Sequence, residues 1–316
     1  FILIVVERAT VVVTEDLAGV RPDRVLAVLA GLSRSVAQRL ISAGQVRVGE
    51  STVDRSTRVC AGDTLDYPIP AEAEHLEPEP VDFAVAFDDG DLLVVNKPPG
   101  LVVHPGAGHR RGTLVHGLVY RYPELRALGE EHRWGLVHRL DRDTSGVLLV
   151  ARTVASHEFL QAELKARRVG RSYVALVNGR LDAATGTIDA PMGRDRARPT
   201  RMAVVSDGRP ARTHFRRLAE WADSSLIALE LETGRTHQIR VHLASIGHPV
   251  VGDLTYGGGG SVLGDAGRVW LHASQIRFPT IDGGRHEVGA VLAEDLRRSL
   301  AVMGEPNNGA DEISRL

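Results

Sequence analysis

The chain has 316 residues, of which 43% are hydrophobic and 25% charged, a composition that is ordinary for a globular protein with room for two domains. Its 38 basic and 40 acidic side chains give a formal net charge of −2, so the total charge does not indicate a nucleic-acid-binding protein. The one cysteine, Cys60, excludes an intramolecular disulfide and a cysteine-based metal cluster, and it fits a reducing cytoplasm.

The chain begins with a short apolar run and two predicted helices. The run at residues 1–6 is far shorter than the roughly 20 residues that cross a bilayer, and it lacks the basic start and the cleavage site of a signal peptide. Residues 22–30 and 33–43 have the spacing of helices, with Ser33 as the N-cap of the second helix and Gly44 just past its end. We therefore expect a small helical unit.

Two short alternating strands follow at residues 46–48 and 64–67. Arginines are scattered over this unit, at Arg34, Arg39, Arg47, Arg55 and Arg58. Taken alone, this pattern favours a solvated basic face over a dedicated RNA contact. Residues 1–18 are expected to form an extension ahead of the unit, which would span residues 19–67.

Residues 68–80 read as an extended linker, because four prolines and four glutamates leave almost nothing to bury. Apolar strands are then expected at residues 92–95, 147–150, 173–177 and 226–231, and helices at residues 157–168 and 237–245. Their irregular order favours the α+β class, with a mixed, largely antiparallel sheet flanked by helices over residues 81–302. Residues 256–260 read as a flexible surface loop and residues 303–316 as a disordered tail.

The most informative segment is the run His-Arg-Leu-Asp-Arg-Asp-Thr-Ser-Gly at residues 138–146, which leads directly into the apolar strand at residues 147–150. Carboxylates among cationic side chains at the mouth of a buried strand cost solvation energy unless they are paired or used. The run therefore reads as a candidate active-site loop, with Asp141 at an edge of the core. The alternative is a loop in which the two aspartates only cap turns and pair with the neighbouring arginines.

This run resembles the active-site motif of the RluA-type RNA pseudouridine synthases, in which the aspartate of His-Arg-Leu-Asp is catalytic. Further segments resemble the family in the same chain order, at residues 91–106, 171–173, 231–242 and 270–273. The resemblance covers residues 81–302, and the His-Pro-Gly-Ala-Gly run at residues 104–108 is most similar to the RluD-like branch, the large ribosomal subunit pseudouridine synthases. Residues 19–67 resemble an S4 RNA-binding domain. The resemblance implies the pseudouridine synthase fold for the larger domain.

The family resemblance implies the catalytic residues Asp141, Tyr173 and Arg240, with Leu271 beneath the target base. A partly buried carboxylate tends to gain a proton, so a fixed cation is needed to keep it anionic, and an arginine serves best because it is always charged. Arg240 is expected on a helix, one turn after His237 and on the same face. Its alternative partner is Glu232 or solvent. Tyr173 would stack on the base.

Basic side chains around the motif are expected to bind the RNA. The expected substrate-binding residues are Leu271, Arg139, Arg142, His138 and His237. The two arginines would meet phosphates on either side of a flipped nucleotide. The S4-like domain would contribute Arg34, Arg39 and Arg47. Residues 165–217 hold 13 Lys or Arg against 4 Asp or Glu, so they form a locally basic segment. The histidines lack the spacing of a zinc site, and no metal or cofactor is expected.

The sequence thus predicts a cytoplasmic RNA pseudouridine synthase that uses an aspartate nucleophile on a flipped uridine of large-subunit (23S) ribosomal RNA. A stem-loop or bulge is the expected target because base flipping costs least there. We expect a monomer that meets ribosomal RNA alone or in pre-ribosomal particles, with no membrane partner. One alternative is a non-catalytic S4-type RNA-binding or ribosome-assembly protein. Another is a retaining glycosidase, which needs a second carboxyl about 5 Å from the first, with Asp143 as the local candidate.

Overall fold

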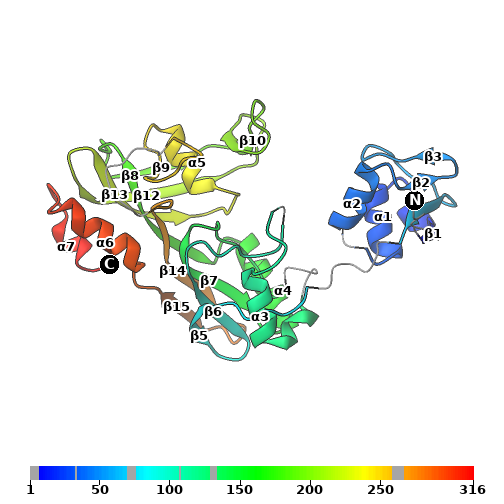
Figure 1. Ribbon diagram of the computed structural model, residues 1–316, viewed down its shortest axis with the longest axis horizontal. Coiled ribbons are helices and arrows are strands. Elements are labelled where there is room, and N and C mark those ends of the chain that lie inside the picture. Colours follow the sequence, from blue (N-terminus) through cyan, green and yellow to red (C-terminus); the bar gives the residue numbers. More distant parts are fainter. Residues whose placement is uncertain (1–6, 33, 70–75, 107, 129–133, 258–266) are drawn as a thin grey trace, which may run out of the picture. The chain divides into compact units, whose positions relative to one another are not determined.

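The computed structural model describes residues 7–32, 34–69, 76–106, 108–128, 134–257 and 267–316 (Figure 1). The chain divides into two compact units, Phe1–Glu77 and Pro78–Leu316. The apolar run at residues 1–6, Ser33, the middle of the predicted linker and the glycines at residues 258–260 lie outside the described residues. None of the described helices is long and apolar enough to cross a membrane.

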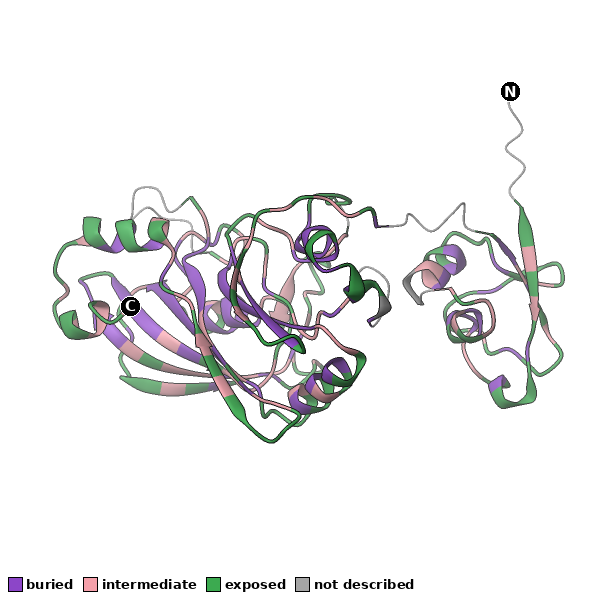
Figure 2. Cartoon of the chain, turned by 90° about the horizontal axis from the view of Figure 1, so that it is seen from below, coloured by how far each residue is buried: buried purple, intermediate pink, exposed green. Residues whose placement is uncertain are grey.

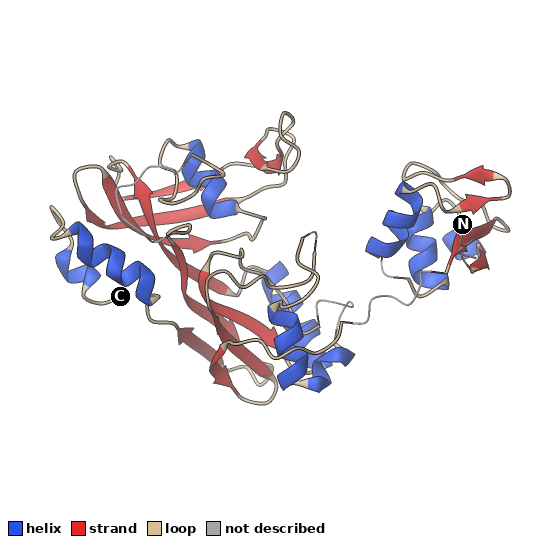
Figure 3. Cartoon of the chain, viewed as in Figure 1, coloured by secondary structure: helices blue, strands red, loops and turns tan. Residues whose placement is uncertain are grey.

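The small unit packs two helices against a four-stranded antiparallel sheet (Figure 3). Its elements are α1 (Pro22–Leu29) and α2 (Arg34–Ser42), one turn of 3-10 helix η1 (Glu15–Leu17), and a sheet in the order β1 (Arg8–Val12), β4 (Thr64–Pro68), β2 (Arg47–Val48) and β3 (Ser51–Thr52). Pro22 starts α1 because its fixed φ suits a first helical position, where no N–H bond is needed. Val25, Leu26 and Leu65 are completely buried between the helices and the sheet.

The N-terminal residues of this unit belong to its sheet. The sequence predicts an extension over residues 1–18, whereas β1 pairs antiparallel with β4 along its whole length. Val13 and Leu17, just after β1, are buried in the core. A strand of five residues with polar side chains on one face gives too short a pattern to be recognised in the sequence, and its pairing partner lies more than 50 residues away.

The large unit is built on a nine-stranded sheet (Figure 1). Its strands, in order across the sheet, are β5 (Ala84–Asp88), β6 (Leu92–Lys97), β7 (Ser145–Ala151), β14 (Leu271–Pro279), β8 (Gly170–Asn178), β13 (Ser224–Leu231), β12 (Arg212–Glu220) and β9 (Thr185–Asp189), and β15 (Arg285–Gly289) also pairs with β14. Among the described strands the β7–β14 pair is parallel and the other pairs are antiparallel. This arrangement confirms the predicted α+β class with a mixed, largely antiparallel sheet.

The remaining elements flank this sheet or project from it. The helices are α3 (Leu114–Arg121), η2 (Pro123–Ala127), α4 (Val154–Lys165), α5 (Gln238–Ser245), α6 (Glu294–Met303) and α7 (Ala310–Ile313). β10 (Met192–Arg194) and β11 (Met202–Val204) form a separate antiparallel pair. This pair carries exposed arginines of the predicted basic segment, at positions 194, 196 and 198.

β6 and β7 read as continuous apolar runs because they are buried inside the unit (Figure 2). β6 ends in Lys97, whose ammonium is completely buried. It donates to three backbone oxygens, those of Pro98 at 2.8 Å, Leu101 at 2.9 Å and Arg142 at 2.8 Å. Burial lowers the pKa of Lys97 to about 7, although the charge of Asp143 opposes this. Lys97 therefore ties the loop after β6 to the loop before β7, a role that the sequence does not reveal because lysines are usually exposed.

Gly146 lies where β7 meets its parallel neighbour β14. Its φ is +109°, a backbone conformation that residues with a side chain rarely adopt. A Cβ at this position would lie 2.1 Å from the backbone oxygen of Ala273. The two strands can pair at this point only because residue 146 has no side chain. The candidate aspartate lies five residues earlier, so this junction also anchors the loop that carries it.

We expect Gly146→Ala to lower the free energy of unfolding by about 3 kcal/mol or more. The substitution both strains the backbone at a positive φ and places a methyl group against the backbone of β14. Urea unfolding measures the loss. Gly283→Ala is the matched control, since Gly283 has a φ of +86° but nothing within 4 Å of a Cβ. That control should lose only about 1 kcal/mol. Equal losses in the two variants would contradict the role of the strand contact.

The C-terminal residues pack against the large sheet, in contrast to the disordered tail that the sequence predicts over residues 303–316. Nε1 of Trp221 donates to the oxygen of Gly304 at 3.1 Å, and the backbone of Glu220 exchanges hydrogen bonds with residues 307–308. α7 packs against β12. The segment is polar and has little apolar surface to bury. Hydrogen bonds of its backbone groups attach it to the sheet, and amino-acid composition does not predict such bonds.

Candidate active site

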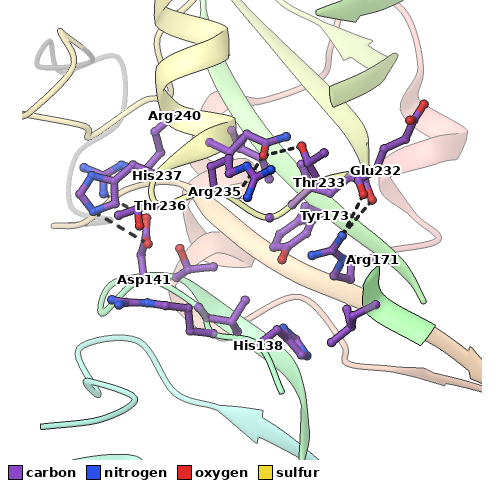
Figure 4. A pocket seen from close by; sticks show the side chains of 18 of the residues that line it. His138, Asp141, Arg171, Tyr173, Glu232, Thr233, Arg235, Thr236, His237 and Arg240 are labelled. Carbon is purple, nitrogen blue, oxygen red and sulfur yellow. Dashed lines mark hydrogen bonds and ion pairs between the residues drawn. The ribbon is translucent and has the colours of Figure 1, made fainter. Parts of the chain in front are cut away.

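A cavity of about 480 Å³ lies in the large unit where four stretches of chain meet (Figure 4). They are the loop before β7, the stretch from the end of α4 to the beginning of β8, the stretch that links β13 to α5, and the first residue of β14. Seven of the predicted site residues line this cavity together: Asp141, Tyr173, Arg240, Leu271, Arg139, His138 and His237. Residues that lie far apart in the sequence are therefore brought to one place.

Asp141 lies beside Arg240 in the cavity wall. Nη1 of Arg240 donates to Oδ2 of Asp141 at 3.1 Å, while its Nε and Nη2 donate to the two oxygens of Asp253 at 2.7 and 2.9 Å. The Asp253 side chain is fully buried, whereas 19% of the Asp141 side chain is exposed. Burial opposes the charge on Arg240, but the hydrogen bonds and charges of the two aspartates outweigh it and raise the pKa of Arg240. Arg240 is a permanent cation whose orientation toward Asp141 is fixed by Asp253.

Asp253 is a site residue that carries no signal in the sequence. It lies beyond the end of α5, in a turn with no apolar periodicity. Its Oδ1 also accepts from the backbone N–H groups of Thr255 and Tyr256 at 3.0 and 3.2 Å. The alternative partner considered for Arg240, Glu232, instead forms its ion pairs with other basic side chains. Only the fold could show which carboxylate Arg240 binds.

His237 faces the same carboxylate from the position just before α5. Its φ of +57° is unusual for a residue other than glycine and costs about 1 to 3 kcal/mol. Nδ1 of His237 lies 2.8 Å from the hydroxyl of Tyr256, and Nε2 lies 3.9 Å from Oδ1 of Asp141. The hydroxyl oxygen also accepts from the N–H of Met202 at 3.1 Å, so Tyr256 fixes the orientation of the imidazole ring.

The surroundings of His237 set the charge state of its ring. Burial lowers the pKa of His237, and the opposing charge of Asp141 does not overcome the effect. The imidazole is therefore neutral near pH 7, with one N–H group. Because Met202 is the first residue of β11, the hydroxyl of Tyr256 joins the loop end of the β10–β11 pair to the residue that faces Asp141.

Tyr173 and Leu271 form an apolar part of the cavity wall. They come from the adjacent strands β8 and β14, where Leu271 lies opposite Ala175, so the two side chains share one face of the sheet. The exposed fractions of Tyr173 and Leu271 are 6% and 3%. Burial raises the pKa of Tyr173 to about 12, so its hydroxyl is protonated at neutral pH. A planar apolar ring could pack here within reach of a carboxylate.

Comparison with known proteins identifies the family. Residues 91–245 match the family model of RNA pseudouridylate synthases, and residues 21–65 match that of the S4 domain. A protein of Chloroflexus aurantiacus, described as an uncharacterized RNA pseudouridine synthase, is 48% identical over 301 residues, which cover 93% of each chain. The chain belongs to the RNA pseudouridine synthase family. It is an isomerase that acts on RNA, as the sequence predicts.

Other relatives of this synthase carry a more specific name. Proteins called ribosomal large subunit pseudouridine synthase D are 43% identical over 255 residues in Zymomonas mobilis and 39% identical over 318 residues in Xanthomonas campestris. The matches cover 78% of this chain and 80% of the first protein, and 96% of this chain and 95% of the second. The solved structure of human RNA pseudouridylate synthase domain containing 1 has a TM-score of 0.56 at 30% identity, over 76% of this chain and 96% of that one. These matches confirm the predicted family and fold.

The two motif arginines of the synthase have different surroundings. Arg139 is exposed and lines the cavity. Arg142 is not among the residues that line it, and its guanidinium binds both carboxylate oxygens of Asp143 at 2.9 and 3.0 Å. This ion pair is the turn-forming contact that we considered as the alternative for the whole loop. The turn-forming role therefore holds for Arg142 and Asp143, whereas Asp141 lies in the cavity wall.

His138 lines the cavity, but one of its ring nitrogens has a structural use. Nε2 accepts a hydrogen bond from the backbone N–H of Leu149 at 3.0 Å, which attaches the motif loop to β7. Burial, helped by the charge of Arg171, lowers the pKa of His138 to about 3. The ring is therefore neutral throughout the physiological range, and an acceptor nitrogen is always available to Leu149.

The low pKa of His138 predicts a loss of stability in acid. Between about pH 6.5 and pH 3 the unfolded chain binds a proton at this residue and the folded chain does not, so the free energy of unfolding falls as the pH falls, by up to about 1.4 kcal/mol per pH unit. In His138→Gln we expect a shallower fall, measured by urea unfolding at pH 7, 6 and 5. The exposed His109 supplies the control His109→Gln, whose curve should run parallel to that of the wild type.

The arginines predicted to bind RNA on the small unit are only partly described. Arg39 and Arg47 are exposed, on α2 and β2 respectively. The side chain of Arg34 lies outside the described part of the structure. The assignment of these three residues to RNA binding stays a prediction.

Proposed function

We propose that this RNA pseudouridine synthase modifies uridines of large-subunit ribosomal RNA and that Asp141 starts the reaction as the nucleophile. The relatives named ribosomal large subunit pseudouridine synthase D support this class of RNA. The observation that carries the assignment of Asp141 is its partly exposed carboxylate, 3.1 Å from the fixed cation of Arg240, in a cavity with Tyr173 in its wall.

The reaction breaks the bond between C1′ and N1 of uridine and forms a bond between C1′ and C5. N1 gains a proton and C5 loses one, so no oxidant, reductant or energy source is needed. The carboxylate of Asp141 would attack C6 of the base or C1′ of the ribose, or assist an elimination at the sugar. In each route it must be anionic and shielded from water at the start. Arg240 meets the first need, and the cavity meets the second.

The other cavity residues would hold the flipped base and the sugar. The ring of Tyr173 supplies a stacking face, worth roughly 1 to 3 kcal/mol for a single base, and Leu271 closes the apolar side. Because the hydroxyl of Tyr173 is protonated at neutral pH, it would act in the loss of the C5 proton only as a relay, releasing its own proton to solvent as it accepts the one from C5. The exposed Arg139 would bind a phosphate at the mouth of the cavity.

Each of the two units has exposed basic residues that suit a structured RNA. We infer that the exposed arginines of the β10–β11 pair and of the small unit bind backbone phosphates. A stem-loop or bulge, whose bases leave the stack most easily, is the expected target, as naked RNA or in a pre-ribosomal particle. The enzyme is expected to act as a monomer in the cytoplasm.

The glycosidase alternative lacks a suitable second carboxyl. Asp143 does not line the cavity and is bound to Arg142. Asp253 is fully buried, with both oxygens occupied by Arg240. Glu232 also lines the cavity, but its carboxylate forms ion pairs with Arg167, Arg212 and His214. None of these three carboxylates is free to flank a glycosidic bond together with Asp141.

Incubation of the full-length enzyme with large-subunit ribosomal RNA tests the proposed substrate. Pseudouridine is mapped by carbodiimide-dependent stops of reverse transcription, on naked transcripts and on assembled subunits. We expect at least one new stop with the wild-type enzyme and none with small-subunit RNA. If no stop appears on either form of the large-subunit RNA, the proposed substrate is wrong.

A further inference from the structure

Arg171 is a buried cation in the wall of the active-site cavity. It lies on β8 two residues before Tyr173, so the two side chains share a face, and Figure 4 shows Arg171 on the side of Tyr173 away from Asp141. Only 8% of Arg171 is exposed. Its Nε has no hydrogen-bond partner, and its Nη2 reaches only the backbone oxygens of Leu231 and Glu232, both at 3.4 Å.

Within the described residues, no carboxylate forms an ion pair with this guanidinium. Nearby arginines do have such partners: Arg167 pairs with Glu232, Arg168 with Glu163 and Arg212 with Asp189. Burial lowers the pKa of Arg171, which reflects the same lack of compensation. An unpaired buried charge destabilises the folded protein. A cation kept in an active-site wall under these conditions indicates that the ligand supplies the anion.

The surroundings of Arg171 leave its outer end open and lead to it from solvent. A Cβ at Gly234 would lie 2.5 Å from Nη1 of Arg171, so a side chain at position 234 would collide with this end of the guanidinium. Lys165, Arg167 and Arg235 line the same cavity and are exposed. A series of cations from the surface to a buried guanidinium suits a strand with regularly spaced negative charges.

We propose that Arg171 binds the phosphodiester group on one side of the target uridine. The inference rests on the proposed function, because it takes the cavity to hold a flipped nucleotide beside Tyr173. A phosphate fits better than a base carbonyl for two reasons. The guanidinium fork matches two phosphate oxygens, and only an anion neutralises the buried charge.

Steady-state kinetics on a short RNA hairpin that contains the mapped uridine test this proposal. In two further substrates a methylphosphonate replaces the phosphate on the 5′ or on the 3′ side of the uridine, which removes the charge and nearly keeps the shape. With the wild-type enzyme we expect one of the two to raise KM by about 10- to 100-fold. For Arg171→Met acting on the unmodified RNA, we expect KM to be raised by the same factor relative to the wild type. Replacing the phosphate by a methylphosphonate should then raise the KM of this variant no further.

A control variant and a measurement of thermal stability separate binding from structure. Arg168→Met removes an exposed arginine three residues earlier and should keep the full sensitivity to the methylphosphonate. Arg171→Lys keeps the charge without the fork and should have an intermediate KM. The Tm of the free Arg171→Met protein should equal or exceed that of the wild type, because an unpaired buried charge is gone.

Three results would overturn the proposal. The wild-type enzyme could tolerate both neutral linkages, the sensitivity could persist in Arg171→Met, or that variant could lose thermal stability with an unchanged KM. The tests on the wild type and on Arg171→Lys do not depend on the folding of Arg171→Met. If the wild-type enzyme modifies no uridine, the proposed function is wrong, and the Arg171 proposal fails with it. If the enzyme modifies uridine but gives one of the three results above, only the Arg171 proposal is wrong.

Discussion

Asp141→Asn is expected to reduce the rate of pseudouridine formation by at least about 1,000-fold, which corresponds to roughly 4 kcal/mol of activation free energy. An amide keeps the shape of the carboxylate and can still accept from Arg240, but it cannot act as the nucleophile. Single-turnover conversion of an RNA hairpin, with enzyme in excess, measures the chemical step.

The same variant should bind RNA and fold as the wild type does. Asp141 is partly exposed, and Arg240 keeps its two hydrogen bonds to Asp253, so little stability depends on the lost charge. Fluorescence anisotropy on the hairpin and urea unfolding check both points. If turnover were retained, the non-catalytic alternative for this loop would stand and Asp141 would not be the nucleophile.

Arg240→Met is expected to abolish turnover and to lower the free energy of unfolding by about 3 to 5 kcal/mol. Activity is lost because Asp141 loses its fixed cation, and stability is lost because the fully buried Asp253 is left without a partner. RNA affinity should change little, since Arg240 contacts carboxylates and not the surface. A loss of affinity with unchanged turnover would instead make Arg240 a phosphate contact.

The double variant Arg240→Met with Asp253→Asn separates the two effects. It contains no uncompensated buried carboxylate at position 253, so much of the stability should return, while turnover stays absent. Asp253→Asn alone should be active at a reduced rate, because Arg240 is still charged but its orientation is no longer fixed. Urea unfolding of all four proteins gives the coupling free energy between the two residues. If the double variant regained activity, Arg240 would serve the fold alone.

The motif residues could be predicted because their signal is local. Asp141, Tyr173, Arg240 and Leu271 each lie in a short segment with a distinctive order of residues, and all four line one cavity. Arg142 is the exception. Its residue type and position suit a phosphate contact, but a carboxylate one residue away binds it and it does not line the cavity.

The residues that the sequence did not reveal act through partners that lie outside their own segment of the chain. Lys97 binds a backbone oxygen 45 residues away, and Asp253 matters only because α5 turns Arg240 toward it. Arg171 is distinguished by what it lacks, a counter-charge, and this is visible only once every neighbouring carboxylate has been located. Burial and pairing at a distance leave no local pattern.

The sequence by itself determined the family, the α+β class, the helices and strands with strong periodicity, and the candidate nucleophile, because each of these depends on the order of residues over a short stretch. The tertiary structure alone decided which cation holds Asp141, which arginines enter the cavity, and that residues 8–12 and 304–313 pack with the sheets of their units. Those outcomes depend on backbone pairing and on desolvated charge pairs between distant segments, whose free energy is set by the geometry of the folded chain.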